Sequence, residues 1–249
     1  MRLGLLMAAR EEPKRILDLP CGHGRVLRML KAAFPKAELT ACDLERDGVD
    51  FCACTFGATP VYSTPDFSDI QLPGTFDLIW VGSLFTHLQL EGWAALMRLL
   101  MPALEREGLL VFTTHGRIST KRMRTGFHYW LDPKDIPQML DEYEREGFAY
   151  RDFPRVEGYG ISLSSPAWVM KEILRHGSLT VLSYTEAGWA AHQDVVVCQY
   201  SSDAAWLNPE ARAGLEASRT PSPGSPITAD QDRDALPDHK DSTGEQGTR

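Results

Sequence analysis

The sequence lacks the marks of several protein classes. It has no run of 18 or more consecutive apolar residues, as a membrane-spanning helix needs, and its weakly apolar start (MRLGLLMAAR) has no cleavage-site pattern. Its five cysteines are odd in number and contain no CxxC pair, unlike a secreted disulfide framework. Basic residues are fewer than acidic ones: 26 against 34 give a net charge of −8, which disfavours nucleic-acid binding. These absences predict a cytoplasmic protein with reduced thiols, no membrane span and no nucleic-acid partner.

The cysteines leave one alternative open. Potential metal ligands fall near the ends of the first two predicted strands: Cys21, His23, Cys42, Cys52 and Cys54. These residues could gather around zinc, but structural zinc sites usually contain closely spaced cysteine pairs. Free thiols in apolar surroundings are the favoured interpretation, so no metal is predicted.

The end of the chain differs in composition from the rest. From Asp203 to Arg249 it carries nine acidic and five basic residues, five prolines and few large apolar residues. Such a segment cannot bury enough apolar surface to offset its conformational entropy. We therefore predict a folded unit over residues 1–207 and a disordered, acidic, Pro- and Ser-rich tail over residues 208–249.

Within the folded unit, β-rich apolar runs alternate with helical patterns. Near-continuous apolar strands separated by helices indicate a mostly parallel sheet with helices on both faces, which is a doubly wound α/β domain. The strands are predicted at Arg15–Asp18, Glu38–Cys42, Thr59–Ser63, Phe76–Val81 and Gly108–Thr113, and the helices at Arg25–Ala33, Val49–Phe56 and Leu90–Leu104.

The later part of the chain departs from this alternation. Helices are predicted at Pro133–Glu146 and Pro166–His176, with short strands at Ala149–Pro154 and Ile161–Leu163 between them. Two further β runs, at 179–184 and 194–200, are joined by only nine residues, which is too few for a parallel crossover. The sheet is therefore predicted to end in an antiparallel hairpin.

A glycine loop follows the first predicted strand. The run DLPCGHG leads from Asp18 into a helical pattern, so a ligand could approach the backbone where the first N–H groups of a helix lie. Asp43 ends the second strand 19 residues after Gly24, where a carboxylate can bind ribose hydroxyls. A dinucleotide fingerprint needs a third small residue, and Leu27 stands in its place. The loop therefore predicts a nucleotide-type cofactor and disfavours NAD and FAD.

Four runs in this order, ILDLPCGHGRVLRML, LTACDL, FDLIWVGSLFTHL and GLLVFTTHG, resemble the class I S-adenosylmethionine-dependent methyltransferases. The resemblance extends over about residues 15–199 and includes the terminal hairpin. Two later runs, GYGIS and GWAAHQDV, resemble a bacterial subgroup associated with glycan assembly. The resemblance implies a Rossmann-like methyltransferase domain over residues 1–207 with cap elements at about 117–178, and S-adenosyl-L-methionine as its cofactor.

The resemblance also implies a set of cofactor-binding residues. Asp18 would hold the cofactor's ammonium group and Asp43 its ribose hydroxyls, and Asp66 with Phe67 would face the adenine. Pro20 departs from the family, which usually has glycine there, so one backbone contact is in doubt. Each acidic residue could instead be an ordinary strand-end turn residue, above all Asp66. The full predicted set is Asp18, Pro20, Cys21, Gly22, His23, Gly24, Asp43, Leu44, Asp66, Phe67, Val81, Gly82 and Ser83.

Methyl transfer to a hydroxyl needs an aligned acceptor and a group that removes the proton. His115 and the pair of His192 and Asp194 are predicted as catalytic residues, because each lies in a loop next to a strand end. His87, Tyr159 and Gln193 are predicted to bind the acceptor. Each of these residues could also be an ordinary packing residue, since histidines and aromatic residues are often buried in the core.

The acceptor itself is left open by the sequence. The leading hypothesis is O-methylation of a sugar, a glycan or another small polar molecule. The alternatives are methylation of a natural product on oxygen or nitrogen, and a catalytically inactive module that binds the cofactor or a partner. Four cations within residues 117–124 predict either a loop that binds an anionic group of the acceptor or a solvated loop.

Overall fold

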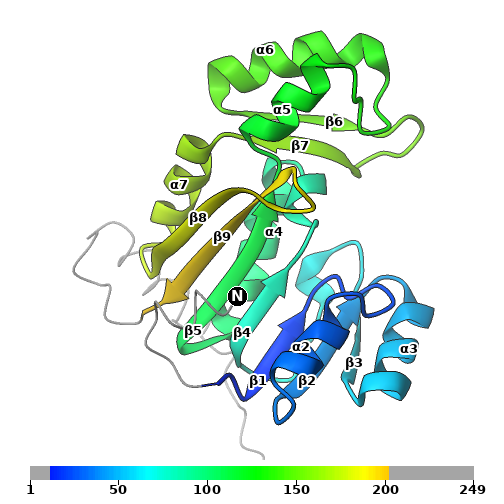
Figure 1. The fold of residues 1–249 in the computed structure, drawn as a ribbon, viewed down its shortest axis with the longest axis vertical. Helices are drawn as coiled ribbons and strands as arrows, with labels where there is room; N and C mark the ends of the chain where they lie inside the picture. Colours follow the sequence, from blue (N-terminus) through cyan, green and yellow to red (C-terminus); the bar gives the residue numbers. More distant parts are fainter. Residues whose placement is uncertain (1–11, 202–249) are drawn as a thin grey trace, which may run out of the picture.

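The central sheet has seven strands in the order β3-β2-β1-β4-β5-β9-β8 (Figure 1). A computed structural model describes residues 12–201 of the chain. The strands β1 to β5 pair in parallel, whereas β9 runs antiparallel to both β5 and β8. The strands are β1 (Arg15–Asp18), β2 (Glu38–Asp43), β3 (Thr59–Tyr62), β4 (Phe76–Val81), β5 (Leu104–Thr114), β8 (Leu179–Trp189) and β9 (Gln193–Tyr200). The predicted doubly wound, mostly parallel sheet with a terminal antiparallel hairpin is confirmed.

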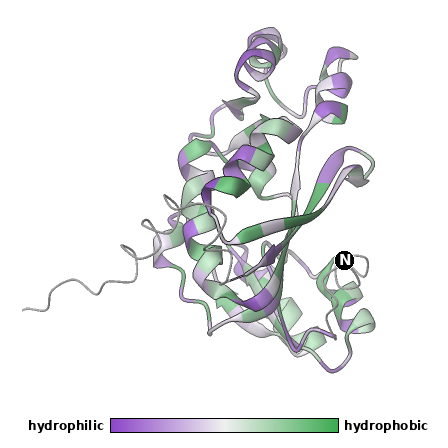
Figure 2. Cartoon of the chain, turned by 90° about the vertical axis from the view of Figure 1, so that its left-hand side faces the viewer, coloured by the Kyte–Doolittle hydropathy of each residue, from purple (hydrophilic) through white to green (hydrophobic). Residues whose placement is uncertain are grey.

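Helices cover both faces of this sheet. Alternate residues of a strand point to opposite faces, so Ile16 packs with α2 (Leu27–Ala33) and α3 (Arg46–Phe56), while Leu17 packs with α4 (Leu90–Leu100) and α7 (Pro166–Arg175). Figure 2 shows hydrophobic residues concentrated in the sheet and in the helices against it. Short 3₁₀ turns complete this part, namely η1 (Phe67–Asp69), η2 (Phe85–His87) and η3 (Met101–Ala103).

A separate cap stands beyond the carboxyl end of β5 (Figure 1). It contains α5 (Arg117–Arg124), η4 (Pro133–Asp135), α6 (Ile136–Glu146) and the antiparallel pair β6 (Phe148–Asp152) and β7 (Gly160–Ser164). The cap has its own hydrophobic core, made of Met123, Tyr129, Leu131, Ile136, Met139, Leu140, Tyr143, Ala149, Ile161 and Leu163. The predicted cap extended to residue 178, but α7 returns to the main sheet and packs there.

Several predicted bounds differ from the structure: β5 begins at Leu104, β8 extends to Trp189, and α3 begins at Arg46. The helix predicted to reach Leu104 ends at Leu100, because Pro102 lies in η3 and Leu104 already pairs with Phe76 in the sheet. The predicted loop at 117–124 is the helix α5, whose last turn carries Lys121, Arg122 and Arg124 near its carbonyl end.

Two regions named in the sequence predictions lie outside the described residues. They are the tail at 208–249 and the first 11 residues. Among residues 12–201, no helix is both long enough and apolar enough to cross a membrane.

Candidate active site

Two buried carboxylates lie at the carboxyl ends of β1 and β2. Asp18 is fully buried and Asp43 is 8% exposed. Asp18 pairs in register with Ala41 of β2 on one side and with Trp80 of β4 on the other. The strands β2 and β3 thus extend the sheet on one side of β1, and the strands β4 and β5 extend it on the other side. Ligands of open α/β sheets bind at such a switch point.

Asp43 holds the glycine loop in place. Its Oδ2 accepts a hydrogen bond from the Gly22 backbone N–H at 2.7 Å, and its Oδ1 accepts one from Glu45 at 3.0 Å. Gly22 and Gly24 have positive φ angles of 48° and 73°, which glycine adopts at little cost. A side chain at Gly24 would lie 2.5 Å from the ring of Phe56. Both glycines are therefore required by the conformation and packing of the loop.

Asp18 is the group in this site that lacks a counter-charge. Among the described residues, neither of its carboxylate oxygens has a hydrogen-bond partner of normal geometry. Burial, and then the negative charge of Asp43, raise the pKa of Asp18 to about 8, against smaller opposing effects of the Leu27 backbone and Arg25. A buried carboxylate without a partner is costly, so a ligand ammonium group placed beside Asp18 would meet an unsatisfied acceptor. This fits the predicted cofactor.

Pro20 does not interrupt the loop. The N–H groups on either side of it extend the sheet, with Leu19 donating to the Trp80 carbonyl and Cys21 to the Cys42 carbonyl, both at 3.0 Å. The missing N–H of proline therefore removes no sheet bond. His23 and Leu44 are exposed at the rim of the loop, and the His23 ring lies beside Asp47 and Phe51.

The residues considered for zinc do not form one group, although the Cys21 and Cys52 thiols both lie at the Gly22 carbonyl, at 3.4 and 3.5 Å. Cys21, Cys42 and Cys52 are buried, whereas Cys54 is exposed. Within residues 12–201, no group of three or more potential ligands is placed to hold a metal ion. Burial raises the pKa of the Cys42 thiol to about 12, so this residue is an uncharged core group.

Asp66 has a clear local role. It caps η1, and one carboxylate oxygen accepts hydrogen bonds from the backbone N–H and the hydroxyl of Ser68 at 2.9 and 2.8 Å. These bonds lower the pKa of Asp66. Phe67 is half-buried and packs on the main core. Contact of this pair with the adenine stays a prediction.

The end of β4 is tied to β5 and β9. Ser83 has a positive φ of 59°, its N–H donates to the Thr113 hydroxyl at 2.8 Å, and its own hydroxyl donates to Gln193 Oε1 at 3.0 Å. Val81 is buried, and a side chain at Gly82 would lie 2.6 Å from the Trp80 indole nitrogen. Gln193 therefore has a partner within the protein, and only its amide N–H₂ group is left for an acceptor.

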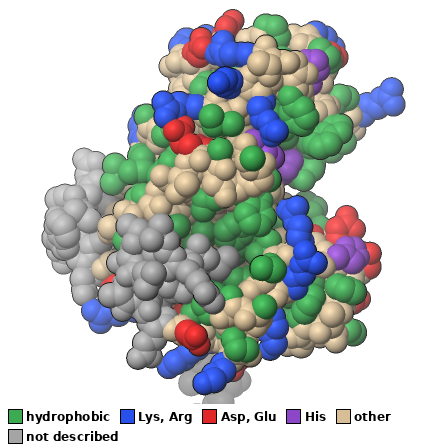
Figure 3. Space-filling model, viewed as in Figure 1, with side chains coloured by type: hydrophobic (Ala, Val, Ile, Leu, Met, Phe, Trp, Pro, Cys, Tyr) green, Lys and Arg blue, Asp and Glu red, His purple; other side chains and the backbone are tan. Residues whose placement is uncertain are grey.

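Three histidines from distant segments gather on this side of the sheet. His87 Nδ1 is 2.7 Å from the Gly160 carbonyl, and His192 Nδ1 is 2.8 Å from the Ala190 carbonyl. His115 lies with its ring stacked against His192 at 5.5 Å, and its pKa is affected by both other histidines. Figure 3 shows histidine (purple) at the indentation between the cap and the lower domain. The histidines, which the sequence analysis treated as separate candidates, thus lie in one cluster.

Two of the three histidines are neutral. Burial lowers the pKa of His87, and it lowers the pKa of fully buried His115 to about 3, so both are neutral at pH 7. Because a carbonyl only accepts hydrogen bonds, His87 and His192 each carry a proton on Nδ1. Neutral His87 therefore presents an unprotonated Nε2.

Tyrosines complete this cluster. The Tyr129 ring lies 4.8 Å from that of His115, and within the described part of the chain its buried hydroxyl has no hydrogen-bond partner. Tyr159, which is 46% exposed, stacks on His87 at 4.9 Å. The cap is fixed to this region because Ser162 donates to the Phe85 carbonyl at 2.8 Å. The cap thus covers the histidine cluster from above.

Comparisons with known proteins agree with this geometry. Residues 16–108 match the family model described as a methyltransferase domain. The acidic ends of β1 and β2 lie within the matched residues. The terminal hairpin lies beyond them and continues the same sheet.

Curated relatives match about half of the chain. The chain is 30% identical over 142 residues to a malonyl-[acyl-carrier protein] O-methyltransferase of Anoxybacillus flavithermus, covering 57% of this chain and 52% of the relative. It is 30% identical over 123 residues to the protein of the same name from Bacillus anthracis, covering 49% of this chain and 45% of the relative. The chain thus spans about half the length of the curated relatives it matches.

Solved methyltransferases share the fold. An S-adenosylmethionine-dependent methyltransferase from Clostridium acetobutylicum has a TM-score of 0.54 at 15% identity, over 80% of this chain and 88% of that one. Mitomycin 7-O-methyltransferase has a TM-score of 0.51 at 12% identity, over 80% and 53%. These structures confirm the predicted Rossmann-like fold, and the match over residues 16–108 agrees with S-adenosylmethionine as the predicted cofactor. Membership of the glycan-associated subgroup stays a prediction.

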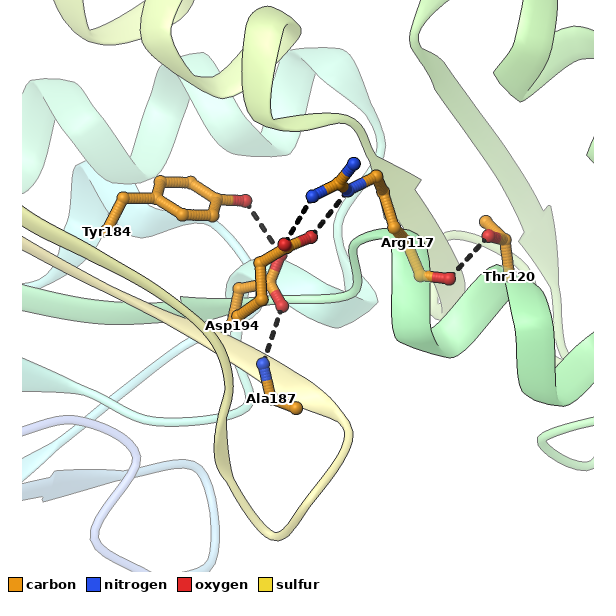
Figure 4. Close-up of polar contacts among 6 residues, drawn as sticks. Arg117, Thr120, Tyr184, Ala187 and Asp194 are labelled. Carbon is orange, nitrogen blue, oxygen red and sulfur yellow. Dashed lines mark hydrogen bonds and ion pairs between the residues drawn. The ribbon is translucent and has the colours of Figure 1, made fainter.

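The contacts of Asp194 do not fit the predicted catalytic role. Its carboxylate is fully buried and accepts hydrogen bonds from the Tyr184 hydroxyl at 2.7 Å and the Ala187 N–H at 3.0 Å (Figure 4). His192 is not among its partners, so the predicted pair of His192 and Asp194 is not formed. Sequence reasoning missed Tyr184, since a tyrosine inside a predicted strand carries no signal of a polar contact.

The basic segment at 117–124 is partly neutralised. Arg117 pairs with Glu186 through its Nε at 2.7 Å, and Arg124 pairs with Glu144. The Arg122 guanidinium lies over the Phe127 ring at 5.4 Å and keeps its charge. The predicted four cations for an anionic acceptor are therefore reduced to Lys121 and Arg122.

Proposed function

We propose that the chain is an S-adenosylmethionine-dependent O-methyltransferase that methylates a hydroxyl group of a sugar, a glycan or another small polar acceptor. The observation that carries this proposal is the cluster of His87, His115 and His192 between the cofactor loop and the cap. Neutral imidazoles suit a hydroxyl acceptor, because such an acceptor must lose a proton as it reacts.

Each residue has a role in this proposal. When bound, S-adenosylmethionine supplies an electrophilic methyl group on a sulfonium. Asp18 binds the ammonium group, and Asp43 binds the ribose while it keeps the loop formed. His87 and His192 each offer Nε2 to the acceptor hydroxyl, and we assign the proton acceptor to this pair. His115 and Tyr129 offer buried polar groups that orient the acceptor.

The relatives favour a second candidate acceptor. Two of them are named malonyl-[acyl-carrier protein] O-methyltransferase, and a malonyl group is methylated on a carboxylate. A carboxylate acceptor needs no base but gains from a nearby cation. Arg117 and Arg124 are already paired with acidic residues of this chain, which favours the neutral hydroxyl.

Calorimetry and labelled-methyl transfer test the proposal. We expect heat of binding with S-adenosylmethionine and none with NAD. Methyl-labelled cofactor is then incubated with glycans, nucleotide sugars, small phenols and a malonyl thioester, and label is expected in a hydroxyl-bearing acceptor. Label in the malonyl thioester alone would show that the methylated group is a carboxylate and not a hydroxyl. Binding without transfer to any acceptor would favour an inactive module, and absence of binding would overturn the cofactor assignment.

A further inference from the structure

The Asp194 carboxylate lies where three segments of the chain meet. It comes from the start of β9, it is fully buried, and it pairs in register with Thr114 at the end of β5. Figure 4 shows Tyr184 of β8 and Ala187 of the hairpin end converging on it, with Arg117 of α5 on the other side. Each carboxylate oxygen has a donor from the β8–β9 hairpin.

The same carboxylate also limits the path of the chain into the cap. A side chain at Gly116 would place its Cβ only 2.0 Å from Asp194 Oδ2, so the Gly116 backbone runs directly against the carboxylate. Gly116 immediately follows His115 and is the residue before the first turn of α5. Contact with Asp194 thus fixes the chain at the junction between the sheet and the cap.

The hairpin end needs such an anchor. Ala187, Ala190 and Ala191 all have positive φ angles, between 48° and 57°, which cost energy in residues other than glycine. The Ala187 N–H is held by Asp194, and the His192 carbonyl accepts a hydrogen bond from Ser119 of α5 at 2.9 Å. The hairpin end is therefore held in a strained conformation at two points, Ala187 and the His192 backbone.

We propose that Asp194 is a positioning residue that holds His115 and His192 face to face, by fixing the backbone next to each of them. It does so at Gly116 for His115 and at Ala187 for His192. The proposal rests on the proposed function for its catalytic meaning. Asp194 itself does not accept the acceptor's proton, because it is fully buried and both oxygens are engaged by the hairpin.

The test uses the ¹⁵N-labelled full chain and long-range ¹H–¹⁵N NMR spectra of its histidine rings, without an acceptor. In the unaltered protein we expect His87 and His192 to show a single Nδ1–H form at pH 7. In Asp194→Asn, the side chain loses its charge and one of its two acceptor oxygens, so its bonds to Ala187 and Tyr184 are weakened. We expect His192 to lose its single form.

Internal and matched controls make the result specific. His87 is held by Gly160, so its signals should not change in Asp194→Asn. Gly116→Ala displaces the same carboxylate without changing its charge and should reproduce the His115 and His192 changes. Gly57→Ala is the control for general destabilisation, since its φ of 66° makes alanine strained while its Cβ would meet nothing within 4 Å. The Kd for S-adenosylhomocysteine should stay within about threefold in all variants.

Two results would overturn the proposal. One is unchanged His115 and His192 signals in both Asp194→Asn and Gly116→Ala. The other is an equal change at His87, which would indicate general loosening of the domain. If Asp194→Asn does not fold, Gly116→Ala and the milder Tyr184→Phe decide the question. Because no acceptor is used, failure to find one would contradict the proposed function and leave this result intact.

Discussion

The cofactor half and the acceptor half of this molecule are built in different ways. In the cofactor half, Asp43 braces a loop that is 21 residues away in the chain, between neighbouring parallel strands. In the acceptor half, His87 is held by a residue 73 positions away and Ser83 by one 110 positions away. The acceptor half therefore exists only when the cap and the terminal hairpin are both in place.

This difference explains what the comparisons match. The family model covers residues 16–108, which include the glycine loop, both strand-end carboxylates and β4. The cap and the hairpin, which supply His115, Tyr129, Tyr159 and His192, lie beyond that range. A shared cofactor keeps the first half constant in chemistry, whereas the acceptor is recognised by loops and a cap that differ between proteins.

The sharpest test of the comparison is a change in the acceptor half. His87→Gln removes an unprotonated nitrogen from the proton-accepting pair, and we expect methyl transfer to fall about 10²- to 10³-fold. The Kd for S-adenosylhomocysteine should not change. Turnover is measured with the acceptor found in the labelled-methyl assay. His176→Gln is the matched control, because His176 follows α7 just before the start of β8, at the end of the β8–β9 pair opposite to His192.

If His87→Gln weakened cofactor binding instead, the two halves would not be separable. Equal loss of transfer in His87→Gln and His192→Gln would mean that the pair acts as a unit. Full transfer in both variants would exclude a histidine as the proton acceptor.

A change in the cofactor half should have the opposite effect. Asp43→Ala removes two hydrogen bonds from the loop and one ribose ligand, so we expect the Kd for S-adenosylhomocysteine to rise about 100-fold. Calorimetry measures this. The histidine ring signals in NMR should stay as they are, and their loss would show that the acceptor half depends on the loop.

The pH dependence of cofactor binding follows from Asp18. Its pKa is raised to about 8 in the absence of a cation, so at pH 7 it is mostly protonated. A bound ammonium group favours the carboxylate, so binding releases a proton below pH 8, and the Kd falls by up to about tenfold per pH unit from pH 6 to pH 8. Calorimetry at pH 7 in two buffers of different ionisation enthalpy measures the proton released. Asp18→Asn should abolish this release, and a pH-independent Kd in the unaltered protein would contradict it.

The smallest effect is expected at Asp66. Its capping bonds to Ser68 are local and exposed, so Asp66→Ala should change the Kd for S-adenosylhomocysteine by no more than about threefold. A tenfold or larger loss in calorimetry would instead establish the predicted contact with the adenine. Ser68→Ala is the control, since it removes the bond from the Ser68 hydroxyl and keeps the carboxylate.

Much of the cofactor half could be predicted from the sequence. Apolar strand runs, two glycines and two strand-end carboxylates are local signals, and all of them were found where expected. The helix α5 was missed because its residues, RISTKRMR, are mostly polar and lack an apolar periodicity, so only the tertiary contacts of Met123 and Ser119 show its buried side. Asp194 was predicted as a base because a carboxylate two residues from a histidine looks like a pair, but its side chain turns into the hairpin.

The sequence by itself determined the doubly wound sheet, the terminal hairpin and the identity of the cofactor loop. These depend on hydrophobic periodicity and on residue types at strand ends, which are properties of short segments. Only the tertiary structure decided which histidine faces which, that Asp194 is engaged by the hairpin, and how the basic segment is paired. Such contacts join residues far apart in the chain, so their geometry is set by the packing of the cap and the hairpin and not by local pattern.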